Sequence, residues 1–397
     1  MNEIKNITII GSGIMGAGIA HSIFKYGLDV TLYDLNAEEL KSSYNTIKSK
    51  ARKKMDPHKI HMATDLETAL MNCDLVIEAI YEDLQVKCEL FKKIGKLADE
   101  STIFATNTSS LSITKIAQAS GRPGQFLGLH FFNPPLIMRL VEMVIHEGLN
   151  PPVLQSAKTF ISAIKKQAVI CRDSPGFIVN RILLPVINEA FYILEKQMIN
   201  RGEIETANEI DTAIVSEEIL LMGPYNLADL TGIDTIFHVS NIIYEGFQKN
   251  PRYKRSPLLE KHFAAGHYGR KCGRGVYYYG NNANDPDINP PLDEKGERIV
   301  PPDTTDFDTL DLISVIINES FRVVEEGIVE DYNDIELAME LGTRWPRGPF
   351  RMAKETGLHV VLKHLIQLYE QSGNQPRYEP SSLFTGLTED LKKFFNK

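Results

Sequence analysis

The first 130 residues of the chain alternate short, strongly apolar runs with longer segments in which apolar residues recur at helical spacing. Apolar runs that are rich in β-branched residues are typical of strands buried on both faces of a parallel sheet. The pattern therefore predicts a doubly wound, parallel α/β sheet of the Rossmann type. The expected strands are Asn6–Ile10, Asp29–Tyr33, 74–79, 102–106 and 126–130.

The turn after the first expected strand is rich in glycine and leads into a helical pattern. Gly11, Gly13 and Gly16 have the spacing G-x-G-x-x-G, and Asp34 follows the second expected strand. In this context the first glycine permits a tight turn, the second lets a pyrophosphate approach the backbone, and the third lets the helix pack closely on the strand. Asp34 would bind the adenosine ribose and repel the additional phosphate of NADP. The turn therefore predicts an NAD site.

Polar residues gather where three later strands are expected to end. Glu78 ends one of them and is followed by Glu82 and Lys87, while residues 107–110 and 130–134 follow the next two. Ligands of such sheets bind beyond the carboxyl ends of the strands, so these clusters predict the position of a site.

His130 is the one histidine among ten that lies at an expected strand end within a polar cluster. Histidine side chains in general have an ordinary pKa of ~6.5, so this residue type suits a group that accepts and returns a proton close to neutral pH. The sequence contains no histidine or cysteine spacing typical of a metal site, so no metal is expected.

The second half of the chain has helical spacing interrupted by glycine, and it repeats itself. An offset of 125 residues superimposes 210–253 on 335–378, and both segments end in Pro-Arg-Tyr. A proline- and aspartate-rich stretch between the two predicts a linker. We expect an all-α C-terminal region with a duplicated helical domain. The predicted domains are 1–174 (α/β), 175–280 (first helical copy), 281–308 (linker) and 309–397 (second copy, structural).

Composition and charge argue against further classes of protein. The 397 residues carry a net charge of −9, which argues against a nucleic-acid-binding protein. No apolar stretch is long enough to span a membrane. The four cysteines have no disulfide-framework spacing, which fits a reducing compartment and predicts a cytoplasmic location.

Nearly the whole chain resembles the 3-hydroxyacyl-CoA dehydrogenase family. The resemblance is carried by the motifs GSGIMGAGIA (11–20), EAIYEDLQVK (78–87), TNTSSLSIT (106–114), HFFNP (130–134), RLVEM (139–143), DSPGFIVNRIL (173–183) and GRKCGRGVYYY (269–279). It implies NAD-dependent interconversion of (3S)-3-hydroxyacyl-CoA and 3-oxoacyl-CoA, in fatty-acid or butanoate metabolism. Pro135, Lys165 and residues 220–222 depart from the family pattern.

The resemblance also implies roles for single residues. His130 would be the general base and Glu142 its carboxylate partner, while Asn180 and Ser109 would hold the substrate oxygen. Further cofactor contacts would come from Ile14, Met15, Glu82, Lys87, Asn107 and Lys271. Lys50 and Lys54 belong to a basic segment that the family uses to hold coenzyme A.

Several alternative interpretations stay open. Ser109 could instead cap the helical pattern that follows it, and Glu82 with Lys87 could form an ion pair on a solvated helix start. Asn180, buried by context, could be a packing amide, and the basic segment could be a solvated helix face. A dehydrogenase of a free hydroxy acid or sugar acid, and a non-catalytic scaffold, are the competing functions. The chain could be a homodimer, or a monomer whose second helical copy packs on the first in place of a partner subunit.

Overall fold

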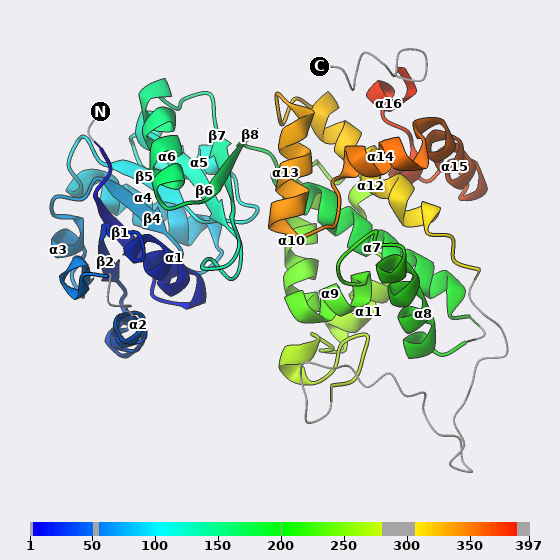
Figure 1. Ribbon diagram of the computed structural model, residues 1–397, viewed down its shortest axis with the longest axis horizontal. Coiled ribbons are helices and arrows are strands. Elements are labelled where there is room, and N and C mark those ends of the chain that lie inside the picture. Colours follow the sequence, from blue (N-terminus) through cyan, green and yellow to red (C-terminus); the bar gives the residue numbers. More distant parts are fainter. Residues whose placement is uncertain (1–2, 51–54, 200, 280–305, 387–397) are drawn as a thin grey trace, which may run out of the picture. The chain divides into compact units, whose positions relative to one another are not determined.

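The computed structural model describes residues 3–50, 55–199, 201–279 and 306–386 (Figure 1). The chain divides into two units, Met1–Phe177 and Ile178–Lys397. Most of the expected linker, residues 281–305, lies outside the described residues. No helix among the described residues is long and apolar enough to cross a membrane.

The first unit contains one eight-stranded sheet with the strand order β3-β2-β1-β4-β5-β6-β7-β8. The five predicted strands are present as β1, β2, β4, β5 and β6, with bounds that differ by one residue at some ends. The strands are β1 (Asn6–Ile10), β2 (Asp29–Tyr33), β3 (Ile60–Ala63), β4 (Leu75–Glu78), β5 (Ile103–Thr106), β6 (Phe126–Phe131), β7 (Leu140–Ile145) and β8 (Gln167–Arg172).

The expectation of a wholly parallel sheet is corrected at one position, since β7 pairs antiparallel with β6. The connection between the two strands, residues 132–139, is too short to contain a crossover helix, so the chain reverses direction instead. All the other neighbouring strands pair in parallel. The antiparallel pairing brings His130 directly opposite Glu142.

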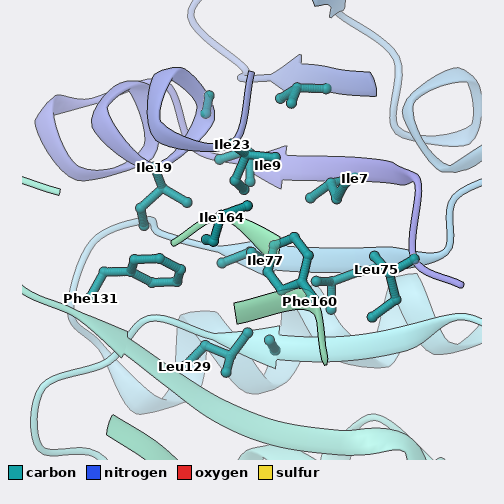
Figure 2. Close-up of a cluster of buried hydrophobic side chains, with 14 of the residues drawn as sticks. Ile7, Ile9, Ile19, Ile23, Leu75, Ile77, Leu129, Phe131, Phe160 and Ile164 are labelled. Atoms are coloured by element: carbon teal, nitrogen blue, oxygen red, sulfur yellow. The ribbon is translucent and has the colours of Figure 1, made fainter. Parts of the chain in front are cut away.

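Helices cover both faces of this sheet. On one face, Ile19 and Ile23 of the first helix and Phe160 near the end of the sixth pack against strand residues such as Ile77 (Figure 2). On the other face Phe91 contacts the rings of Phe104 and Phe126. The helices are α1 (Ile14–Phe24), α2 (Ala37–Ser49), α3 (Leu66–Leu70), α4 (Leu84–Leu97), α5 (Ile113–Ala119) and α6 (Pro151–Ala163).

The second unit is helical, as predicted, and its described residues form two series of elements in the same order. The first series is α7 (Val179–Gln197), α8 (Glu203–Ser216), α9 (Pro224–Thr231), α10 (Ile233–Gly246), η3 (Pro251–Tyr253) and α11 (Pro257–Ala264). The second series is α12 (Leu310–Glu325), α13 (Tyr332–Gly342), α14 (Pro349–Thr356), α15 (Leu358–Gln371), η5 (Pro376–Tyr378) and α16 (Ser382–Gly386). A short 3-10 turn, η4 (Arg270–Cys272), follows α11 in the first series.

Buried ion pairs join the two series. Arg181 of α7 donates hydrogen bonds to Glu319 of α12 and, at 2.9 Å, to Glu326 just beyond it. A second contact has its carboxylate in the first series: Glu189 of α7 accepts hydrogen bonds from Arg377, at 2.8 Å, and from Tyr378, both of η5. Each long helix therefore presents a buried carboxylate to the other series.

Candidate active site

The glycine-rich turn between β1 and α1 is shaped by close contacts of its backbone. Gly11 has a φ of +104°, and a Cβ at this position would lie 2.6 Å from the carbonyl oxygen of Ala79. At Gly16 a Cβ would lie 1.9 Å from the carbonyl oxygen of Gly11. A Cβ at Gly13 would instead meet only Glu39 Oε1, at 3.8 Å, so this stretch of backbone is open to a ligand. The open backbone at the start of α1 can accept a phosphate group.

Asp34 lies beside this turn, directly after β2. Its Oδ2 accepts hydrogen bonds from the Ser12 N–H group at 2.6 Å and from the Ser12 hydroxyl at 2.9 Å. Its Oδ1 accepts one from the Asn36 N–H group, and the side chain is half-buried. The turn and the predicted ribose-binding carboxylate are therefore brought together.

Glu78, at the end of β4, lies within a buried ionic cluster. Lys87 Nζ is 2.5 Å from Glu78 Oε1 and 3.3 Å from Glu82 Oε2, and both Lys87 and Glu78 are fully buried. Thr106 at the end of β5 donates a hydrogen bond to Glu78 at 2.6 Å. The ion pair between Glu82 and Lys87 that we considered as an alternative exists, but Lys87 lies beneath the surface and not on a solvated helix start.

Glu82 connects this cluster to the segment that follows β5. It accepts hydrogen bonds from the Thr108 hydroxyl at 2.5 Å and from the Ser109 N–H group at 3.0 Å. The N-cap of α5 is Ser112, whose side chain accepts from the Lys115 N–H group. The interpretation of Ser109 as the helix cap is therefore wrong.

His130 and Glu142 form a buried pair on adjacent strands. His130 Nδ1 lies 2.6 Å from Glu142 Oε2, and Glu142 is fully buried. The rings of Phe132 and Phe177 lie 4.4 Å and 6.0 Å from the imidazole ring, centroid to centroid. Close to the pair, Asn107 Oδ1 accepts a hydrogen bond from the Phe131 N–H group. The carboxyl edge of the sheet therefore holds a shielded imidazole whose ring orientation is fixed by a carboxylate.

The other predicted residues belong to other elements of the chain. Asn180 is half-buried, rather than buried as expected, in the first turn of α7 in the second unit. Lys271 of η4, also in the second unit, pairs with Asp234 at 2.5 Å. Lys50 is exposed at the end of α2, and Lys54 lies outside the described residues. Ile14, the first residue of α1, is 82% exposed beside the turn.

Sequence reasoning assigned no role to Asp173, which follows β8. Its carboxylate accepts hydrogen bonds from the Ser112 and Thr114 hydroxyls and from the Ile113 and Thr114 N–H groups. It thereby fixes the start of α5 and the segment that carries Ser109. Its only local signal is an acidic residue directly after a strand, and because β8 runs antiparallel to β6 this position is not at the carboxyl ends of β1 to β6.

Family models cover most of the sequence. The NAD binding domain of 3-hydroxyacyl-CoA dehydrogenase matches residues 6–174. The C-terminal domain of the same family matches residues 176–279 and 309–393.

Individual relatives agree with this result. The mitochondrial hydroxyacyl-coenzyme A dehydrogenase of Homo sapiens is 38% identical over 293 residues, spanning 70% of this chain and 91% of the human protein. The 3-hydroxyadipyl-CoA dehydrogenase of Escherichia coli is 29% identical over 469 residues, spanning 96% of this chain and 97% of that protein. The crystal structure of 3-hydroxybutyryl-CoA dehydrogenase from Escherichia coli is similar with a TM-score of 0.85 and 26% identity, covering 100% of both chains. This chain belongs to the 3-hydroxyacyl-CoA dehydrogenase family and is an NAD-dependent oxidoreductase.

Proposed function

We propose that the protein interconverts (3S)-3-hydroxyacyl-CoA and 3-oxoacyl-CoA, with His130 and Glu142 as its general acid/base pair, in fatty-acid or butanoate metabolism. The proposal depends above all on the buried contact of 2.6 Å between His130 Nδ1 and Glu142 at the carboxyl edge of the sheet. The glycine-rich turn and Asp34 lie at the same edge.

The pair suits proton transfer at one defined atom. With Nδ1 bonded to Glu142, Nε2 is the nitrogen that takes the proton from the substrate hydroxyl or returns it. The negative charge of Glu142 stabilises the imidazolium that forms, as in other histidine–carboxylate pairs. Ser109 and Asn180 would hold the substrate oxygen, and Lys50 and Lys54 would bind phosphates of coenzyme A.

The residues around the turn fit NAD, which would accept or donate the hydride when bound. We assign the pyrophosphate to the open backbone at Gly13 and the ribose to Asp34. Because Lys87 is fully buried, it would act on the cofactor site by holding Glu82 in place. The other cofactor contacts assigned to this site are Ile14, Met15, Asn107 and Lys271.

The direct test follows absorbance at 340 nm with acetoacetyl-CoA and NADH. Rapid loss of absorbance is expected with this pair, and little or none with NADPH or with free acetoacetate. His130→Ala should lower turnover at least ~100-fold, because the general base is lost. Turnover of the free acid alone would move the assignment to a dehydrogenase of free hydroxy acids or sugar acids, and near-normal turnover of His130→Ala would refute the role of His130.

We further propose that residues 175–280 and 309–397 are copies of one helical domain, and that the second copy occupies the place of a partner subunit. Asn188 and Asn318 support this, since their amides bond the carbonyls of Lys254 and Glu379, which differ by the 125-residue offset. The buried glutamates of α7 and α12, Glu189 and Glu319, each bind an arginine of the other series, which resembles a two-fold interface.

This second proposal predicts that the protein is a monomer. Light scattering should give the mass of a single chain, 44.7 kDa. A stable dimer formed through the first helical series would contradict it.

A further inference from the structure

A cavity of about 300 Å³ opens on the first unit, where the end of α1 meets the β6–β7 connection and the α6–β8 connection. Four cationic side chains line it: Lys25, Arg139, Lys165 and Lys166. No acidic residue is among the lining residues. The cavity is at the lower end of the size range for small-molecule sites.

The positive charge of these side chains is not neutralised by the protein. Across the described residues no carboxylate oxygen lies within 4.0 Å of any of the four cationic groups, although the chain has a net charge of −9. Lys166 is half-buried, and burial together with the nearby charge of Lys25 lowers its pKa to about 8. An anion bound in the cavity would offset the free-energy cost of keeping Lys166 charged beside the other cations.

The cavity also has an apolar side. Tyr26, Leu136 and Ile137 line it with side chains that are 40%, 39% and 57% exposed. Large apolar residues beside uncompensated cations suit a ligand that has both an apolar group and a strong negative charge.

Lys166 connects the cavity to the β6–β7 connection. Its ammonium group donates hydrogen bonds to the carbonyls of Pro135 at 2.5 Å and Met138 at 2.7 Å. These carbonyls lie in the segment that joins the strand of His130 to the strand of Glu142. Lys166 therefore links the cavity to the segment that joins the two strands of the proposed catalytic pair.

We infer that this cavity binds a small organic phosphate, with the phosphate at Lys25, Lys165 and Lys166 and the apolar group against Tyr26 and Ile137. This inference does not depend on the proposed reaction, because none of these residues belongs to the proposed cofactor, substrate or catalytic set.

Binding can be measured by isothermal titration calorimetry of 1-naphthyl phosphate into the full chain saturated with NADH, which fills the cofactor site. The double variant Lys25→Gln/Lys165→Gln should weaken binding about tenfold, since two charge-assisted contacts are lost. The control Lys92→Gln/Lys93→Gln removes the same charge from α4, whose Phe91 packs on the other face of the sheet, and should change affinity less than about twofold. Equal weakening in both variants, or no binding to the parent protein, would overturn the inference.

Three further measurements identify the site. At pH 8, binding should take up protons, seen as a dependence of the heat on the buffer's ionisation enthalpy, because the anion raises the pKa of Lys166 from about 8. Lys166→Arg should keep binding but abolish the uptake, since arginine is always charged.

Inorganic phosphate should bind more weakly than the naphthyl ester; equal affinity would contradict the apolar contact. Displacement by coenzyme A would show that the cavity belongs to the substrate site and would also overturn the inference.

Discussion

Close histidine–carboxylate pairs occur both in the first unit, where strands β6 and β7 meet, and in the helical unit. His130 lies 2.6 Å from Glu142 at the sheet edge, while in the helical unit His262 lies 2.7 Å from Glu203 and His364 lies 2.8 Å from Asp311. Distance and chemistry alone do not separate them. The difference is in what surrounds each pair.

The sheet-edge pair is held on two hydrogen-bonded strands, beside the Asn107 side chain and two aromatic rings. The pair of His262 and Glu203 instead joins the helices α11 and α8. Burial alone would raise the pKa of Glu203, but the hydrogen bond and charge of His262 outweigh it and lower the pKa. We therefore keep the proposed proton-transfer role for the pair of His130 and Glu142, because the strands place it beside the proposed cofactor site.

The largest expected effect separates the two regions by activity. Glu142→Gln should lower turnover at least ~100-fold, because the imidazolium formed in the reaction loses its negative partner. Glu203→Gln is the matched change in the helical unit and should leave turnover within about twofold. Steady-state assays with acetoacetyl-CoA and NADH measure both. A large loss in Glu203→Gln without a loss of folded protein would remove the distinction.

A smaller effect concerns cofactor choice at the sheet edge. Asp34→Ala should shift the ratio of kcat/KM for NADH over NADPH toward NADPH by about tenfold, because the repulsion of the 2′-phosphate is removed. Asp29→Ala, at the other end of the same strand, is the control and should leave the ratio unchanged. An unchanged ratio in Asp34→Ala would refute the proposed role.

The smallest effects are on stability and its pH dependence in the helical unit. Glu203→Gln should lower the free energy of unfolding by about 1 kcal/mol at pH 7. This loss should shrink as the pH falls, since a carboxyl with a lowered pKa loses its stabilising contribution on protonation.

Burial raises the pKa of Asp311 despite its contact with His364, so its charged form opposes folding at pH 7. Asp311→Asn should therefore cost less than about 0.5 kcal/mol. Urea unfolding followed by circular dichroism at pH 7 and at about pH 4 checks both variants; a larger cost for Asp311→Asn would contradict this ranking.

The predictable parts of the fold were those with a strong local signal. The strand Asn6–Ile10 is a short run rich in β-branched residues, as is typical of a buried parallel strand. Residues Ile60–Ala63 form a short edge strand with two exposed positions, so the sequence carries little pattern there. The reversal at β7 has a signal in hindsight, because residues 132–139 cannot contain a crossover helix.

The candidate site was predictable to a different degree. The turn and Asp34 follow from local spacing, whereas Glu142 was linked to His130 only through the family resemblance. The strand register gives the physical reason for that link, and register depends on pairing along the whole strand. The burial of Lys87 depends on Glu78 and so on tertiary packing, which no local pattern reports.

The ion pairs between α7 and α12 have a consequence for how the protein responds to dilution. Arg181 and Glu319 belong to one polypeptide, so their contact forms within the molecule. An equivalent interface between separate subunits is lost as the protein concentration falls below the dissociation constant. The contact between Arg181 and Glu319 near the start of α7 therefore does not depend on the concentration of the protein.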